Sequence, residues 1–288
     1  MSATRPKLGV SSCLMGQQVR YDGGHKHNRY VTEMLGEWFD FVPWCPEVAI
    51  GLSIPRPPIR LVKKDDRIRA VGVEDGNLDV TERLADYARD NVPYFDELSG
   101  YIVKKDSPSC GMERVKIYTE GMPERKGTGI YTGVMMEAMP DLPVEEEGRL
   151  SDPGLRENFI DRVFTRFRWQ QMMADGLSPA ALVDFHTRHK FFILAHNEPV
   201  YRKLGQLVAR AGKEDLAQLA NEYFHLLMDG LKTKATPGKH ANVLMHIMGF
   251  FKEELDADDK QELLEIIEAY RNGLVPLVVP VTLPNHFL

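Results

Sequence analysis

Residues 7–13 read KLGVSSC, an apolar run that predicts a buried strand ending close to a cysteine. The same order returns at residues 39–45, FDFVPWC, where a second predicted strand ends directly before a cysteine. A third predicted strand, GYIVK at residues 100–104, leads towards the next one. Between these strands, residues 29–38 and 80–91 show helical apolar spacing. This alternation predicts an α/β domain with a Rossmann-like, mainly parallel sheet.

The three predicted strands lead to the only cysteines of the chain, Cys13, Cys45 and Cys110. Parallel strands end at the same edge of a sheet, and chemistry in such folds gathers beyond that edge. The residues around each cysteine are rich in Gly, Pro and polar types, which suits functional loops. We therefore expect the three thiols to meet. A buried free cysteine of the core is the competing interpretation for each one.

The second half of the chain has a different pattern. Residues 139–153, MPDLPVEEEGRLSDP, combine Pro, Gly and three consecutive Glu and predict an interdomain linker. We therefore expect a cluster-binding domain at residues 1–145 and a separate all-α domain at residues 152–288. Three prolines in the tail, residues 274–288, predict an extended strap. The expected helices are residues 155–173, 180–194, 199–211, 214–231, 240–255 and 258–270.

Composition narrows the class of protein and its location. Apolar residues make up 43% of the chain and charged residues 27%, which is ordinary for a globular protein. No apolar run approaches the ~20 residues needed to cross a bilayer, and the N-terminus lacks the apolar core of a signal peptide. Three cysteines are too few for a disulfide scaffold. We expect a cytoplasmic protein with no membrane partner.

The net charge of −6 conceals an uneven distribution along the chain. Residues 1–148 contain 19 Lys and Arg against 24 Asp and Glu, whereas residues 156–252 contain 14 against 9. Residues 253–272 then carry 2 basic and 8 acidic residues. A basic face on the helical half is thus compatible with the acidic total, and nucleic acid is not excluded as a partner.

Three thiolates without a fourth cysteine suggest a metal centre with an open coordination position. A four-iron cluster bound by four cysteines has every iron occupied, whereas three cysteines leave one iron open. A zinc ion held by three cysteines and a water is the competing inorganic centre. Soft iron suits a substrate sulfur, while zinc more usually activates water.

Three motifs resemble those of the thiouracil desulfidases. They are C-L-x-G-x-x-x-R-Y-D-G at residues 13–23, C-P-E-x-x-x-G-L-x-x-P-R-x-P at residues 45–58, and K-x-x-S-P-S-C-G at residues 104–111. The resemblance covers residues 7–145. It implies that the three cysteines hold a [4Fe–4S] cluster whose fourth iron, open to substrate, takes the sulfur of a thiocarbonyl.

The second half resembles the helical domain fused to this desulfidase domain in longer homologues. Residues 185–197, 236–251 and 270–280 carry the match. Such two-domain proteins look like desulfidases acting on 4-thiouridine in transfer RNA. The resemblance therefore implies [4Fe–4S]-dependent, non-redox desulfuration of 4-thiouridine in tRNA to uridine, with release of sulfide. The helical domain would bind the tRNA.

The hypothetical mechanism needs a base and a hydrogen-bonding group beside the cluster. Glu47 is the candidate general base that activates the attacking water, and a surface or capping Glu is the alternative. The resemblance favours Ser107 as a group that hydrogen-bonds the substrate or passes a proton. Further candidates for substrate binding are Arg20, Asp22, Lys104 and Ser109. RYDG is also a good turn sequence, Ser109 could cap a turn, and Lys104 could be a solvated lysine.

Basic residues of the helical half are candidates for phosphate contacts, which position RNA without reading its sequence. Solvated helix faces are the alternative interpretation of the same residues. The candidates are Arg162, Arg166, Arg188, Lys190, Lys234 and Lys239.

Three other functions stay open at this point. The nearest is desulfuration of free thiouracil bases or nucleosides. A non-catalytic, RNA-binding redox sensor that uses the cluster as a switch is a function of another class, and a zinc hydrolase is the third. The sequence does not indicate the oligomeric state.

Overall fold

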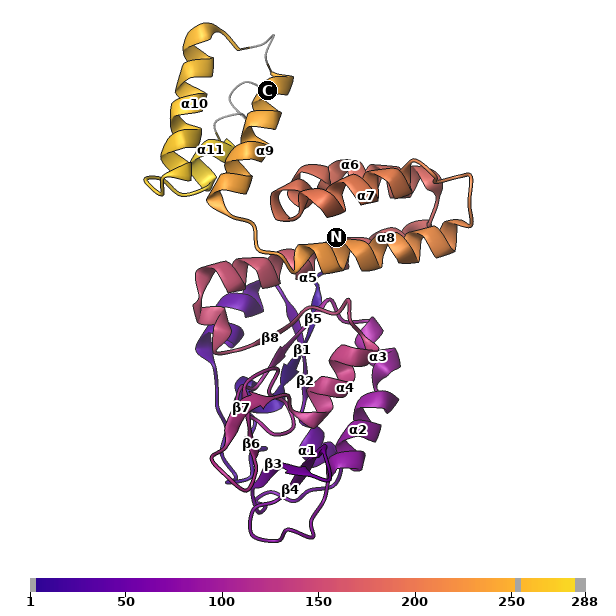
Figure 1. Ribbon diagram of the computed structural model, residues 1–288, viewed down its shortest axis with the longest axis vertical. Coiled ribbons are helices and arrows are strands. Elements are labelled where there is room, and N and C mark those ends of the chain that lie inside the picture. The colour runs from indigo at the N-terminus through magenta and orange to yellow at the C-terminus, as the bar shows by residue number, and fades with distance from the viewer. Residues whose placement is uncertain (1–3, 252–254, 283–288) are drawn as a thin grey trace. The chain divides into compact units, whose positions relative to one another are not determined.

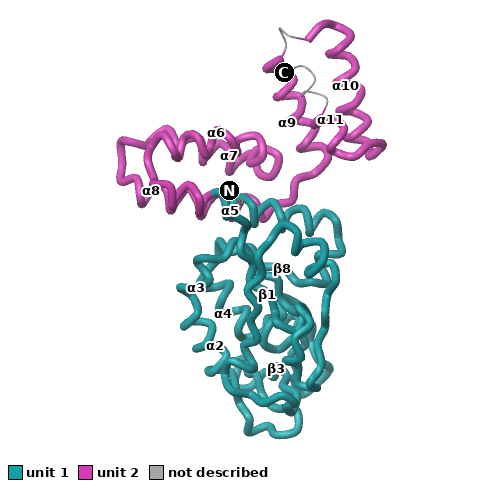
Figure 2. The backbone as a smooth tube through the Cα atoms, turned by 180° about the vertical axis from the view of Figure 1, so that it is seen from behind, with its two compact units in different colours: residues 1–168 teal, residues 169–288 magenta. Residues whose placement is uncertain are grey.

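The computed structural model describes residues 4–251 and 255–282 (Figure 1). The chain forms two compact units, residues 1–168 and residues 169–288 (Figure 2). The division falls inside helix α5, Pro153–Gly176, and not in the linker expected at residues 139–153. Part of that expected linker forms strand β8 and is buried in the first unit, so its Pro, Gly and Glu content was a misleading signal.

The first unit contains the predicted parallel sheet. Strands β1 (Lys7–Ser11), β2 (Asp40–Trp44), β5 (Gly100–Val103) and β8 (Val144–Glu146) lie in the order β2-β1-β5-β8. Every neighbouring pair in this sheet is parallel. The prediction of a Rossmann-like α/β unit followed by a helical one is confirmed.

Both faces of this sheet are buried, as is usual for parallel sheets. Leu8 and Val10 of β1 pack with Phe159 and Val163 of α5 on one face. The other face packs against α2 (Thr81–Asp90), α3 (Val92–Asp96) and α4 (Ile130–Ala138), and its core contains Tyr101. Alternate residues of each strand thus reach different cores. The segment between β1 and β2 that was expected to form an ordinary helix, residues 29–38, forms a π-helical turn, Tyr30–Met34, followed by a 3₁₀ turn, Leu35–Glu37.

A second, mixed sheet adds to the predicted one. It has the order β4-β3-β6-β7 and contains antiparallel pairs as well as a parallel one. Asp65 and Asp66 between β3 and β4 both have positive φ, which is typical of a tight two-residue hairpin. The strands are β3 (Ile59–Lys64), β4 (Arg67–Gly72), β6 (Val115–Tyr118) and β7 (Glu124–Gly127).

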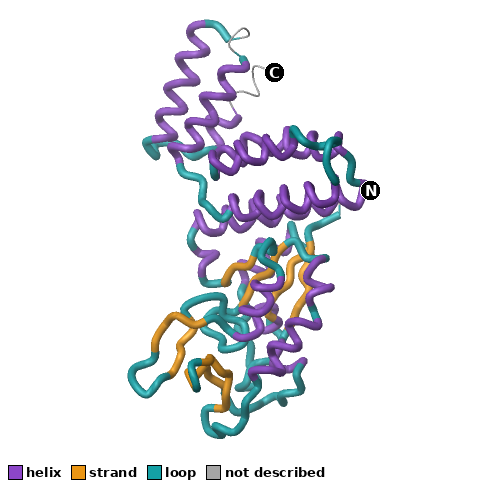
Figure 3. The backbone as a smooth tube through the Cα atoms, turned by 45° about the vertical axis from the view of Figure 1, so that its right-hand side comes forward, coloured by secondary structure: helices purple, strands orange, loops and turns teal. Residues whose placement is uncertain are grey.

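The described residues of the second unit form helices and loops without strands (Figure 3). A helix lies at each of the six predicted positions, the first of them mostly within the first unit, and side chains such as Ser178, Asn197 and Thr236 cap N-termini. Of the helix predicted at residues 240–255, residues 252–254 lie outside the described part of the chain. No helix among the described residues is both long and apolar enough to span a bilayer. The helices after α5 are α6 (Pro179–His196), α7 (Glu198–Val208), α8 (Leu216–Leu231), α9 (Pro237–Phe250), α10 (Ala257–Arg271) and α11 (Val278–Thr282).

Helix α11 corrects the expectation of an extended strap at residues 274–288. Pro280 is the third residue of this five-residue helix. Proline is tolerated there because backbone N–H groups in the first turn have no partner within the helix. Residues 283–288 lie outside the described part of the chain. The main core of this unit surrounds Trp169 and Tyr223, whose rings stack with their centroids 5.6 Å apart.

Candidate active site

The three cysteines meet at one edge of the parallel sheet, as predicted. Cys13 lies in a 3₁₀ turn after β1, and Cys45 precedes helix α1 (Pro46–Ala49) directly after β2. Cys110 follows the central strand β5 by seven residues. All three line one cavity of about 440 Å³. Because β2, β1 and β5 are neighbours in the sheet, residues up to 97 positions apart reach the same place.

All three thiols are free, and burial raises the pKa of each. The pKa of Cys13 rises to about 11, through burial and then through the charge of Cys45. Burial raises the pKa of Cys110 well above its usual value, and Glu47 and the other two cysteines add to the effect. Thiolates here would repel one another. They need a cationic group between them, as a metal centre provides.

The cavity offers more room than a single metal ion needs. Among the described residues, no three His, Cys, Asp or Glu side chains lie close enough together to hold one ion. The three thiols instead belong to the wall of a larger cavity, of about 440 Å³. In a four-iron cluster each thiolate binds a different iron, so its ligands lie farther apart than those around one zinc ion.

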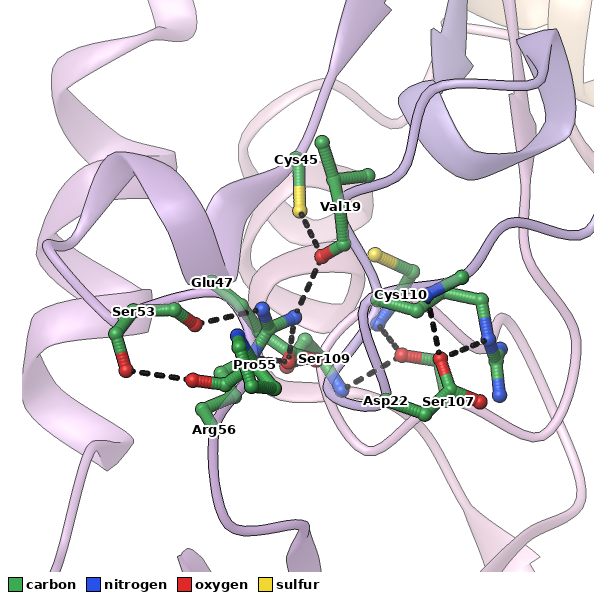
Figure 4. Close-up of polar contacts among 12 residues, drawn as sticks. Val19, Asp22, Cys45, Glu47, Ser53, Pro55, Arg56, Ser107, Ser109 and Cys110 are labelled. Carbon is green, nitrogen blue, oxygen red and sulfur yellow. Dashed lines mark hydrogen bonds and ion pairs between the residues drawn. The ribbon is translucent and has the colours of Figure 1, made fainter.

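Glu47 lines the same cavity from helix α1, and both of its carboxylate oxygens are engaged (Figure 4). Oε2 accepts hydrogen bonds from Arg56 Nε at 2.9 Å and Arg56 Nη2 at 2.6 Å. Oε1 accepts a hydrogen bond from Ser109 Oγ at 2.8 Å. Only 14% of the Glu47 side chain and 5% of the Arg56 side chain are exposed. The carboxylate is therefore a fixed and largely buried member of an ion pair.

Arg56 connects three segments of the site and is not among the residues predicted from the sequence. Its Nη2 donates to Val19 O at 2.9 Å, and its Nη1 donates to Ser53 O at 3.2 Å. Cys45 Sγ also faces Val19 O, at 3.9 Å (Figure 4). The sequence did contain an indication of its role, because Arg56 lies in the same motif, residues 45–58, as Cys45 and Glu47.

The two candidate serines have different positions. Ser107 lines the cavity, and its Oγ accepts hydrogen bonds from the backbone N–H groups of Ser109 at 3.3 Å and Cys110 at 3.0 Å. Ser109 is fully buried and donates its hydroxyl to Glu47. It lies behind the carboxylate and not at the cavity wall. The expected substrate contact of Ser109 is therefore corrected to a role in positioning Glu47.

A glycine allows the loop with Ser109 and Cys110 to pack closely. A Cβ at Gly129 would lie 2.5 Å from the carbonyl carbon of Ser109, which is closer than real Cβ contacts. Thr132, one turn later, donates its Oγ1–H to Cys110 O at 2.8 Å. The start of helix α4 therefore holds the backbone of a candidate ligand loop.

Two buried glutamates fix the ends of the loop that carries Ser109 and Cys110. Both lie within residues 139–153, the segment that was expected to be a linker. Glu147 accepts from the backbone N–H of Lys105 at 2.7 Å and pairs with Lys104 Nζ. Glu146 accepts from the backbone N–H of Met112 at 2.9 Å, and burial raises the pKa of its carboxyl. Lys104 lines the cavity, but its ion pair with Glu147 shows that it is not a solvated lysine.

Arg20 and Asp22 belong to a turn at the rim. Arg20 lines the cavity, and its guanidinium lies 5.2 Å from the ring centroid of Tyr21, another lining residue. Asp22 Oδ1 accepts from the backbone N–H of Gly24 at 3.0 Å and pairs with Arg20 Nε at 3.4 Å. Asp22 is not a lining residue, so its contacts support the turn interpretation of RYDG.

Two of the predicted RNA contacts belong to the first unit. Arg166 is 3% exposed and donates its Nε to Leu98 O at 2.8 Å. This burial corrects the expectation of a phosphate contact, because Arg166 is a structural residue of α5. Arg162 is partly buried on the same helix, and its Nε has no hydrogen-bond partner among the described residues.

The four remaining cationic candidates lie in the second unit. Arg188 is exposed and pairs with Asp184 one turn earlier at 2.9 Å. Lys190 Nζ lies 5.1 Å from the ring centroid of Phe191. Lys239 Nζ donates to a backbone carbonyl at 2.6 Å, whereas Lys234 is exposed. None of the four lines the active-site cavity.

Comparisons with known proteins agree with the division of the chain into an α/β unit and a helical unit. The 2-thiouracil desulfurase family model matches residues 8–147, and DUF1722, a protein family of unknown function, matches residues 190–288. The uncharacterized protein YbgA of Escherichia coli (strain K12) is 36% identical over 133 residues, which cover 46% of this chain and 79% of YbgA. The uncharacterized protein YbbK of Bacillus subtilis (strain 168) is 30% identical over 149 residues, 50% of this chain and 97% of YbbK.

A solved structure is also similar. The [4Fe-4S]-dependent thiouracil desulfidase TudS is 30% identical, with a TM-score of 0.41, over 51% of this chain and 95% of TudS. The family resemblance inferred from the three motifs is confirmed by the family model, which matches the same part of the chain. The chain is an enzyme that belongs to the 2-thiouracil desulfurase family, with a DUF1722 region after the desulfurase domain.

Proposed function

We propose that the first unit desulfurates a thiolated uracil with a [4Fe–4S] cluster held by Cys13, Cys45 and Cys110. The observation that carries this proposal is that the three thiols, Glu47 and Ser107 line one cavity. The size of the cavity and the mutual repulsion of the thiolates support a multi-iron group as the ligand. When bound through three thiolates, such a cluster supplies one iron without a protein ligand, which can accept a substrate sulfur.

Glu47 is the proposed general base. Arg56 keeps the carboxylate in one orientation by donating two hydrogen bonds to Oε2. Oε1 accepts the hydroxyl of Ser109 and has a second lone pair, which can accept a proton from water in the cavity. In the balanced reaction, water supplies the new oxygen and the thiocarbonyl sulfur leaves as sulfide, without electron transfer. Ser109 helps to hold the base in place.

Ser107 is the proposed hydrogen-bond donor to the substrate. Its oxygen already accepts two backbone N–H groups, so its own proton is left to donate. Because Ser107 lines the cavity, this donor faces the space in which a pyrimidine would bind. Lys104 and Arg20 contribute positive charge to the same wall.

For the substrate, we propose 4-thiouridine in tRNA, bound in part by the helical unit. Residues 156–252 contain 14 basic and 9 acidic residues, and this net positive charge supports binding of RNA. The exposure of Arg188 and Lys234 supports it as well. Free thiouracil bases or nucleosides are the second candidate, since the cavity is large enough for a single base. The free thiols suit the cytoplasm, our expected location.

The test compares two substrates of the cluster-loaded protein under anaerobic conditions. One is tRNA that contains 4-thiouridine, and the other is free 4-thiouracil. We expect sulfide release and loss of 4-thiouridine from the tRNA, with an affinity that falls steeply as salt rises. If 4-thiouridine in tRNA survives while free 4-thiouracil is consumed, the tRNA assignment is wrong and the second candidate is correct.

A further inference from the structure

Three different hydroxyl groups contact the three polar groups of Cys110. Its backbone N–H donates to Ser107 Oγ at 3.0 Å, and its carbonyl oxygen accepts the Oγ1–H of Thr132 at 2.8 Å. Its thiol is hydrogen-bonded to the side chain of Ser11, which also lines the active-site cavity. The first two contacts fix the backbone of a proposed cluster ligand, whereas the third reaches its sulfur atom.

The parallel sheet brings Ser11 to this sulfur. Ser11 is the last residue of β1, and β1 pairs with β5, from which the chain continues towards Cys110. Ser11 is buried, and its Oγ accepts the backbone N–H of Lys104, the residue directly after β5, at 3.0 Å. Because the oxygen already accepts this N–H, the hydroxyl proton is left to donate to the sulfur.

The hydrogen bonds that reach the thiols come from two kinds of donor. Burial raises the pKa of the Cys45 thiol, and the backbone N–H groups of Val48 and Glu47 lower it by hydrogen bonding. Burial also raises the pKa of Cys110, and there the opposing hydrogen bond comes from the Ser11 side chain. A side-chain donor can be removed by substitution, whereas a backbone N–H remains. Ser11 is therefore a position at which the effect of such a hydrogen bond can be measured.

A hydrogen bond to a ligand sulfur changes how much negative charge that sulfur gives to iron. The donated proton draws charge away from the thiolate, so the iron atoms receive less of it. Iron with less negative charge is a stronger Lewis acid towards a substrate sulfur. The same hydrogen bond stabilises the reduced state of a cluster and raises its reduction potential. The potential thus measures the effect, although the proposed desulfuration transfers no electrons.

We propose that Ser11 is a positioning residue of the active site, whose hydroxyl donates to Cys110 Sγ and makes the bound cluster a better acceptor of substrate sulfur. This inference rests on the proposed function for the place of the cluster. Ser11 acts through Cys110. The backbone N–H of Lys104 holds the hydroxyl in the orientation that this donation needs.

The test measures the reduction potential of the anaerobically prepared, cluster-loaded protein by redox titration followed by electron paramagnetic resonance. Ser11→Ala removes the hydroxyl, so the potential should become more negative. Loss of one charge-assisted hydrogen bond changes an equilibrium constant by up to about tenfold, which corresponds to about 59 mV for one electron. Ser11→Thr keeps the hydroxyl and should have the wild-type potential.

Thr132→Val is the matched control. Thr132 is also a buried hydroxyl residue in contact with Cys110, but it donates to the backbone carbonyl and not to the sulfur. Valine keeps the shape of threonine, so this variant loosens the backbone of the same ligand and leaves the donor to its sulfur in place. We expect the wild-type potential. An unchanged potential in Ser11→Ala would overturn the inference, and so would an equal shift in Ser11→Ala and Thr132→Val.

A second pair of variants serves if Ser11→Ala does not fold or does not hold four irons. Ser11→Thr and Ser11→Val have the same shape and differ in the hydroxyl, so the potential of the valine variant should be the more negative one. Equal potentials in these two variants would overturn the inference.

The sulfide assay separates this inference from the proposed function. If the wild-type protein releases sulfide but Ser11→Ala keeps the wild-type potential, the inference fails and the desulfidase proposal stands. If the potential shifts as expected but no thiolated substrate releases sulfide, the desulfidase proposal fails and the hydrogen bond from Ser11 to the cluster ligand stands.

Discussion

The candidate functional residues are arranged differently in the two units of the chain. In the first unit, Cys13, Cys45 and Cys110 come from distant parts of the sequence and line one cavity. In the second unit, the basic candidates lie on several helices and turns, and no described site brings them together. Parallel strands deliver residues to a common edge, whereas amphipathic helices expose charged residues wherever they meet solvent. Convergence is therefore the more informative signal of chemistry.

The two units also differ in how their charges are paired. The first unit has buried ion pairs, such as Arg56 with Glu47 and Lys104 with Glu147. The second unit has exposed pairs within one helix, such as Arg188 with Asp184. Removing one partner of a buried pair costs about 3–5 kcal/mol, but an exposed pair contributes about 0–1 kcal/mol. Substitutions should therefore have much larger effects in the first unit.

The largest expected effect follows from loss of a thiol. Cys45→Ser should lose bound iron and all measurable sulfide release, because serine replaces a soft thiolate ligand. Iron analysis and a sulfide assay of the anaerobically prepared protein measure both. The helical circular-dichroism signal of the whole chain should stay close to that of the wild type. A variant that keeps both its iron and its activity would show that the three cysteines do not act together.

Glu47→Gln should keep the iron but lose activity. Removal of a general base lowers the rate by about 10²–10⁴-fold, so kcat should fall by that factor while iron content stays at the wild-type level. Glu37→Gln, an exposed glutamate of the same unit, is the control and should be fully active. Unchanged turnover in the Glu47 variant would show that Glu47 is not the general base. Absence of sulfide release from the iron-loaded wild-type protein as well would favour the redox-sensing function over catalysis.

Arg56→Lys tests the positioning of the base. Lysine keeps the charge but cannot place two nitrogens on Glu47 Oε2, so we expect kcat to fall by up to about 10²-fold with little change in KM. Arg56→Ala would leave the buried Glu47 charge unpaired and destabilise the first unit by about 3–5 kcal/mol, seen in thermal unfolding. If the lysine variant shows an altered KM and normal kcat, Arg56 contacts substrate instead.

The smallest expected effect lies in the helical unit. Arg188→Gln and Lys234→Gln should each weaken tRNA binding and lower the slope of log affinity against log salt by about one. Turnover of free 4-thiouracil should not change. Arg89→Gln, an exposed arginine of the first unit, serves as the control. If neither helical variant alters tRNA affinity or its salt dependence, other residues bind the RNA.

Strands β1, β2 and β5, the helices of the second half and the meeting of the three thiols could be predicted, because apolar periodicity is local and parallel strands end at a common edge of the sheet. The roles of Arg56, Glu146 and Glu147 could not. Their positions depend on hydrogen bonds across 9 to 42 residues, and a buried Glu looks the same in sequence as an exposed one. The expected phosphate contact of Arg166 was wrong for the same reason. Its burial depends on the packing of α5, where its Nε donates to Leu98 O, and the sequence does not show this.

The most direct test of the central claim is removal and restoration of iron in the wild-type chain, with sulfide release from 4-thiouracil as the readout. We predict that the iron-free protein releases no sulfide, that reconstitution to about four irons per chain restores release, and that zinc does not. Equal sulfide release by an iron-free or zinc-loaded protein would contradict the account. In that case the convergent cysteines would serve another chemistry.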